Sequence, residues 1–80
     1  MNLKVTTESG ANGKLFAVHA ADCADLAKRR VIADANDITG ALQEVANCYG
    51  GYGDNGDQPE NEADTRLWTS IKACAKKAVR

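Results

Sequence analysis

Apolar and polar side chains alternate along residues 2–8, with Leu3, Val5 and Thr7 on one face and the residues between them on the other. A period of two is typical of a strand with one buried face. Residues 9–13 are rich in glycine, serine and asparagine, and their Asn-Gly pair readily supplies the positive φ of a tight turn. A second β-prone run occupies residues 14–20. The pattern therefore predicts a β-hairpin over residues 2–20.

A short helix is predicted over residues 22–30, because Asp22 is a good N-cap and apolar residues recur on one face after it. The next residues, Val31–Ala33, fit either an extension of that helix or a short third strand. Two β-branched residues directly before a polar turn favour the strand.

Apolar residues recur at three- and four-residue spacing after Asp37, which predicts a capped helix over residues 37–49. A glycine pair ends this helix, and residues 50–59 form a glycine-rich acidic loop without periodicity. The clearest helical stripe lies in residues 60–80. Its acidic residues come first and its basic residues last, which complements the helix dipole.

These elements predict an α+β fold in one domain, residues 1–80. We expect a small two-layer structure in which a sheet of two or three strands, the hairpin with or without a short third strand, packs against two or three helices. Hydrophobic residues make up 44% of the chain and charged residues 26%. These values are close to those of ordinary globular domains and differ from the low hydrophobicity and high charge of disordered chains. Because the chain holds one Phe, one Trp and two Tyr, the core must be thin and built largely from small side chains.

The net charge of −1 offers no overall field that would steer the protein to nucleic acid or to an anionic membrane. No apolar run approaches the roughly 20 residues of a membrane span, and the first residues lack the apolar core of a signal peptide. Three cysteines at wide spacing are unlike a disulfide framework. The sequence therefore predicts a cytoplasmic protein with free thiols, no membrane association and no cofactor.

Four residues of the chain are of the types that bind zinc, the number that a closed tetrahedral site needs. His19 and Cys23 are close in sequence, but Cys48 and Cys74 stand alone on separate predicted helices, without the paired C-x-x-C spacing of zinc sites. A free cysteine on an apolar stripe acts as a small hydrophobe. We therefore expect no metal, and a zinc-stabilised structural domain is the further alternative.

The same His19 and Cys23 are the best candidates for a catalytic pair, because a helix N-terminus favours the thiolate. No second histidine, oxyanion loop or phosphate-binding loop accompanies them. The sequence therefore predicts no catalytic residue and a protein that is not an enzyme.

By elimination, we expect a small intracellular module that binds another protein. A phage or mobile-element accessory protein that binds and modulates a host protein is one protein of this kind, and the composition is compatible with that origin without indicating it. The predicted contact surface is the loop after residue 48, the acidic start of the last helix, and a tryptophan that is either a core residue or a partner anchor. These residues are Tyr49, Tyr52, Asp54, Asp57, Glu60 and Trp68.

The alternative function is nucleic-acid binding through two basic clusters at predicted helix ends. Helix C-termini favour cations for their own stability, which explains these clusters without a ligand. A homodimer is a further possibility, because a second copy would complete the core of so small a domain. The basic residues concerned are Lys28, Arg29, Arg30, Lys72, Lys76, Lys77 and Arg80.

Overall fold

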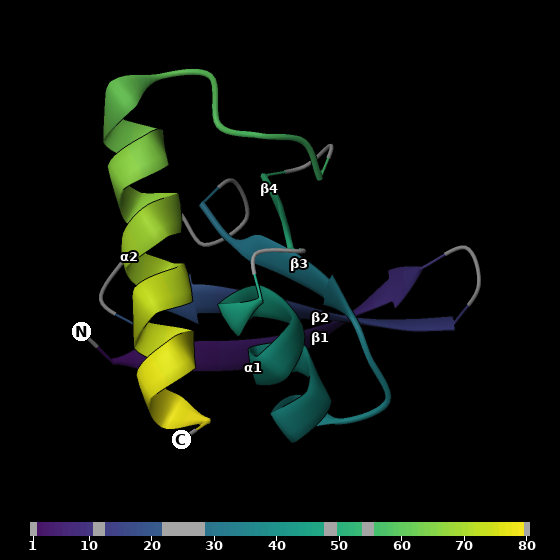
Figure 1. The fold of residues 1–80 in the computed structure, drawn as a ribbon. Coiled ribbons are helices and arrows are strands. Elements are labelled where there is room, and N and C mark those ends of the chain that lie inside the picture. Colours follow the sequence, from purple (N-terminus) through teal and green to yellow (C-terminus); the bar gives the residue numbers. More distant parts are fainter. Residues whose placement is uncertain (1, 11–12, 22–28, 48–49, 54–55, 80) are drawn as a thin grey trace.

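The structure is a computed structural model that describes residues 2–10, 13–21, 29–47, 50–53 and 56–79. Four antiparallel strands form one sheet in the order β1-β2-β3-β4, and two helices lie side by side on one of its faces (Figure 1). The result is the predicted two-layer α+β arrangement. The elements are β1 (Leu3–Gly10), β2 (Gly13–Ala20), β3 (Val31–Asp34), α1 (Ile38–Ala46), β4 (Gly51–Tyr52) and α2 (Glu62–Ala78).

The first two strands form the predicted hairpin, with a register that runs from Leu3 opposite Ala20 to Gly10 opposite Gly13. Strand β3 pairs antiparallel with β2, so the interpretation of residues 31–33 as a strand is confirmed. The helix predicted over residues 22–30 falls mostly outside the described residues, and Arg29 and Arg30 are not helical. The described residues contain two helices.

Strand β4 lies inside the segment predicted to be only a loop, and it makes the sheet four-stranded rather than two- or three-stranded. Tyr52 is held on both sides of its backbone, because its N–H donates to the carbonyl of Asp57 at 2.7 Å while β3 flanks its other edge. Gly51 permits this turn, since a Cβ at that position would lie 1.9 Å from the carbonyl oxygen of Gly56. Gly56 itself has a φ of 67°, which favours glycine.

Both helices begin with a side-chain cap. Asp37 precedes α1 in an extended conformation and accepts a hydrogen bond from the N–H of Gly40 at 2.7 Å, so the predicted cap is confirmed. Asn61 caps α2 in the same way. Helix α1 ends at Ala46, before the predicted glycine stop, and α2 extends from residue 62 to residue 78.

The core lies between the helices and the sheet face that they cover. Strand alternation directs Phe16 and Val18 toward the helices, and it directs Thr6 and His19 to the opposite face. Small side chains let the helices approach the sheet closely. No helix among the described residues is long and apolar enough to cross a membrane. The buried core residues are Phe16, Val18, Val31, Ala33, Ala41, Val45, Tyr52, Ile71 and Ala75.

The fully buried Ile71 provides a test of this core, and Ile38, which is 54% exposed at the start of α1, provides its matched control. We expect Ile71→Ala to lower the free energy of unfolding by about 2–5 kcal/mol, because it removes buried methyl groups and leaves a cavity. Ile38→Ala should change it by less than about 0.5 kcal/mol. Urea denaturation of both variants measures the difference, and equal effects would contradict the observed packing.

Candidate functional site

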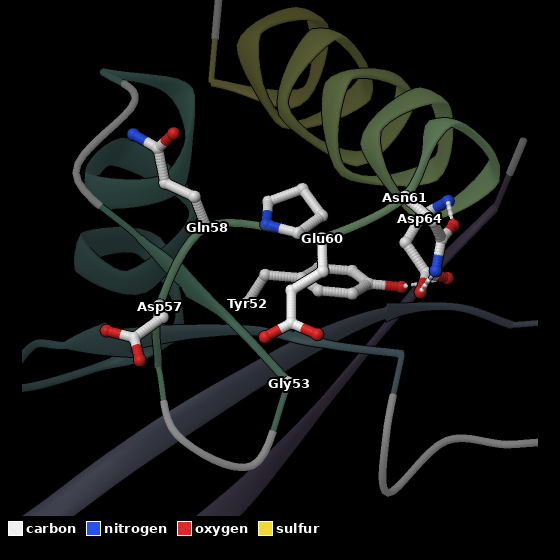
Figure 2. Close-up of a pocket in the computed structure, with 8 residues that line it drawn as sticks. Tyr52, Gly53, Asp57, Gln58, Glu60, Asn61 and Asp64 are labelled. Carbon is white, nitrogen blue, oxygen red and sulfur yellow. Dashed lines mark hydrogen bonds between the residues drawn. The ribbon is translucent and has the colours of Figure 1, made fainter.

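A hollow of about 240 Å³ lies where β4, the following connection and the start of α2 meet (Figure 2). Tyr52 comes from β4, and Asp64 comes from the first turn of α2. The connection between them folds back toward the helix, so residues distant in sequence share one pocket. Its lining residues are Tyr52, Gly53, Asp57, Gln58, Pro59, Glu60, Asn61 and Asp64.

The carboxylate of Asp64 holds one side of this pocket together. Its Oδ1 accepts a hydrogen bond from the Tyr52 hydroxyl at 3.1 Å, and its Oδ2 accepts one from Nδ2 of Asn61 at 2.9 Å (Figure 2). The guanidinium Nε of Arg29 lies 3.5 Å from Oδ1. A single side chain therefore links β4, the start of α2 and the segment before β3.

Two further carboxylates, those of Asp57 and Glu60, are on exposed residues at the rim of the pocket. In Figure 2 the Glu60 carboxylate stands in front of the Tyr52 ring, while the Asp57 side chain points away from it on the other side. Arg29 compensates the charge of the inner carboxylate, that of Asp64. The rim thus presents negative charge at a site built to hold its shape, and such a rim attracts a cationic group.

A second, larger hollow of about 500 Å³ lies beside the first, along one side of α2. The Trp68 ring is half-buried against the core, and its indole N–H donates to the carbonyl of Gly50 at 3.4 Å. The Nζ of Lys72 lies 3.2 Å from the centre of this ring, in a cation–π contact. Trp68 is therefore both a core residue and part of an accessible wall. The groove is lined by Ala46, Gln58, Trp68, Thr69, Lys72, Ala73 and Lys76.

Gln58 lines both hollows, so the pocket and the groove are neighbours that share one lining residue, and we call the two together the pocket–groove surface. The structure thus brings Tyr52, Asp57 and Glu60 together with Trp68, four of the six predicted contact residues. Tyr49 and Asp54 lie outside the described residues.

No protein-family model, curated protein or solved structure matches this chain. The chemistry of the site therefore comes from its own residues. The pocket lining offers carboxylates, amides and a phenol. Such groups bind cations and hydrogen-bond donors.

The predicted basic residues that the structure describes do not form a single patch: Lys72 and Lys76 line the groove on α2, while Arg29 and Arg30 lie elsewhere. Arg29 pairs with Asp64 in the first turn of α2, whereas the exposed Lys76 and Lys77 lie in its last turn. Twelve residues of helix separate Asp64 from Lys76, which is about 18 Å at 1.5 Å per residue. Lys72 is buried against a tryptophan ring. Lys28 and Arg80 lie outside the described residues.

The remaining basic residue, Arg30, forms an ion pair on the sheet face that the helices leave uncovered. Its guanidinium lies in a two-bond ion pair with the carboxylate of Glu8, with contacts of 2.5 and 2.9 Å. Because Glu8 belongs to β1 and Arg30 directly precedes β3, the pair crosses β2. The small Ala17 occupies this same face of β2, paired with Thr6 and Ile32, and it is fully buried.

The candidate metal ligands are dispersed as far as the structure describes them. His19 is buried, with its Nε2 3.0 Å from the Thr6 hydroxyl, and strand alternation places it on the sheet face opposite α2. Cys74 lies on α2. Among the described residues no group of three or more His, Cys, Asp or Glu side chains is placed to hold a metal ion. Cys23 and Cys48 lie outside the described residues.

Sequence reasoning did not single out Asp64 or Gln58, and it named Arg29 only as a candidate for a basic patch, not as the partner of Asp64. A local signal existed for Asp64, because an asparagine three residues earlier resembles a helix-capping pair. Its bond to Tyr52 and its ion pair with Arg29 join segments 12 and 35 residues away, and no local pattern encodes such contacts.

The hydrogen bond between Tyr52 and Asp64 gives a direct test of the pocket wall. Tyr52→Phe removes the donor and should lower the free energy of unfolding by about 1.5 kcal/mol, as expected for a hydrogen bond to a charged group. Combining it with Asp64→Ala, which removes the acceptor, in a double-mutant cycle measured by urea denaturation isolates the pairwise coupling. A coupling energy near zero would show that the bond does not hold the wall.

The ion pair between Glu8 and Arg30 predicts a dependence of stability on pH. Hydrogen bonding to Arg30 lowers the pKa of the Glu8 carboxyl below its usual value of 4.5, although burial acts to raise it. The charges of Arg30 and His19 lower this pKa further. A carboxyl with a lowered folded-state pKa stabilises the fold above its unfolded-state pKa, and this contribution is lost as the pH falls through the folded-state value.

We therefore expect Glu8→Gln to destabilise the protein at neutral pH, and the difference from wild type to shrink steadily below about pH 4.5. Urea denaturation of both proteins at a series of pH values checks this. A difference that stays constant down to about pH 3 would assign the effect of the substitution to packing rather than to charge.

Proposed function

We propose that the protein is a non-catalytic module that binds a segment of another protein on the pocket–groove surface. The segment would carry a lysine or arginine, which enters the acidic pocket, next to an apolar side chain, which lies along Trp68. By occupying its partner in this way the module would modulate that partner, as an accessory protein does.

The observation that carries this proposal is that the two hollows lie next to each other and share Gln58 as a lining residue. A cation and an apolar side chain a few residues apart in an extended segment can then be held at once. The bonds of Asp64 support the proposal because they fix the pocket before any partner arrives, and a preformed site loses less entropy on binding. A half-exposed tryptophan at such a surface is a typical anchor of binding energy.

At the pocket, charge supports a basic protein segment over a nucleic acid, while the neighbouring groove carries Lys72 and the exposed Lys76. The exposed rim carboxylates of Asp57 and Glu60 would repel phosphates, and both Arg29 and Arg30 are already paired with carboxylates. Nucleic-acid binding therefore stays the alternative, and the experiment below separates the two.

Site-specific crosslinking tests the surface. A photoreactive amino acid at Gln58 should crosslink the bound partner, while the same group at the exposed Gln43 on α1, which lines neither hollow, should not. Mass spectrometry of the crosslinked product identifies the contacted segment, which we expect to contain a lysine or arginine. Equal crosslinking from both positions, or a segment without a basic residue, would contradict the proposal.

Charge reversal tests the recognition chemistry on the partner segment so identified. Glu60→Lys should weaken binding at least tenfold, because this carboxylate stands over the Tyr52 ring, whereas Asp34→Lys, an equal charge change on an exposed residue at the end of β3, should change it little. Titration with the synthetic peptide measures both affinities. Recovery of nucleic acid alone, lost after nuclease treatment or at high salt, would favour the alternative function.

A further inference from the structure

Strand β1 is an edge strand, and it is long for one. It runs from Leu3 to Gly10, eight residues against a typical strand length of five or six, and its only partner among the described strands is β2. The opposite edge, β4, has two residues and is closed by the bridge from Tyr52 to Asp57. A long open edge is a template for another strand, and proteins usually shorten or cover it.

The hydrogen-bond pattern of the hairpin shows which groups β1 presents at this edge. The N–H of Ala21 donates to the carbonyl of Asn2 at 2.8 Å, which fixes the phase of the ladder. Since alternate residues bond across an antiparallel pair, the even-numbered residues of β1 face β2. The backbone N–H and C=O groups of residues 3, 5, 7 and 9 therefore point outward.

Among the antiparallel registers open to two copies of this edge, the one centred on Thr6 pairs the most backbone groups. In that register Val5 stands opposite Thr7 of the second copy, and Leu3 stands opposite Ser9. The outward N–H and C=O groups of all four residues in each strand therefore face outward groups of the other strand. The register centred on Thr7 also has the correct phase, but it leaves residue 3 of each copy unpaired. Hydrogen bonding thus favours the centre at Thr6.

Charge favours the same register. Lys4 and Glu8 project from the same face of β1, and a centre at Thr6 places each lysine opposite the glutamate of the other copy. Lys4 is exposed, and the Glu8 side chain is 32% exposed although it is paired with Arg30. A carboxylate has about four acceptor positions, so it can take a lysine in addition to the arginine.

We propose that the protein forms a two-fold symmetric dimer through its β1 edge, with β1 of one copy antiparallel to β1 of the other and Thr6 on the symmetry axis. The two sheets then become one continuous sheet. This interface shares no residue with the pocket–groove surface, so a test of the dimer is independent of a test of the proposed function.

Proline at position 7 tests the interface without touching the hairpin. The N–H of Thr7 points outward and its side chain is exposed, so Thr7→Pro should keep the fold while removing bonds between copies. Thr7→Ala keeps the N–H and is the matched control. By sedimentation equilibrium we expect wild type and Thr7→Ala at twice the 8.5 kDa chain mass, and Thr7→Pro at the chain mass. Circular dichroism and thermal unfolding verify that each variant is folded.

A cysteine at position 6 tests the register. Opposed residues of a non-hydrogen-bonded antiparallel pair have Cα atoms about 4.5 Å apart, within disulfide range. Thr6→Cys should therefore form a covalent dimer on mild oxidation. Lys4→Cys should crosslink no more than wild type, because in this register position 4 of one copy lies opposite position 8, not position 4, of the other. A wild-type protein that is monomeric at every concentration would overturn the proposal. So would a dimer that survives Thr7→Pro and gives no Thr6→Cys crosslink.

Discussion

The packing of α2 against α1 and the sheet is the interaction on which the other features depend. Ile71 and Ala75 are fully buried, and they anchor the helix against strands whose facing residues are mostly valine and alanine. With so few large side chains available, the helix must pack closely against α1 and the sheet to exclude water. That packing fixes the start of α2 next to β4, and it thereby sets Asp64 within reach of Tyr52.

Polar contacts then hold the parts that the thin core does not reach. The Asp64 carboxylate ties β4 to the helix start, and the pair of Glu8 with Arg30 ties the first and third strands across the second. Both arrangements give a half-buried carboxylate an arginine partner, which limits the cost of removing charge from water. One of them also shapes the pocket, so the site is a product of the same contacts that complete the fold.

The sequence predicts the parts of this fold whose signals are local. The hairpin follows from alternation and an Asn-Gly turn, and α1 from the Asp37 cap and its apolar stripe. Strand β4 was missed because two residues carry no period, and its pairing depends on the close approach of Gly51 to Gly56. The pocket was predicted only as a loop with acidic residues. Its shape depends on contacts between segments that are far apart in sequence, and no pattern within one segment encodes them.

The positions of the two proposed interfaces have a consequence for binding strength. Strand β1 lies at one edge of the sheet, and β4, which contributes Tyr52 to the pocket, lies at the other. In the β1-linked dimer the two β4 strands end a continuous sheet, about 34 Å apart at about 4.8 Å per strand spacing. The two pocket–groove surfaces would then be held at a fixed separation.

A partner that displays two basic segments at a matching distance would bind both, and the second contact would form at high effective concentration. Such a dimer would need only modest affinity at each pocket, which suits surfaces of this small size.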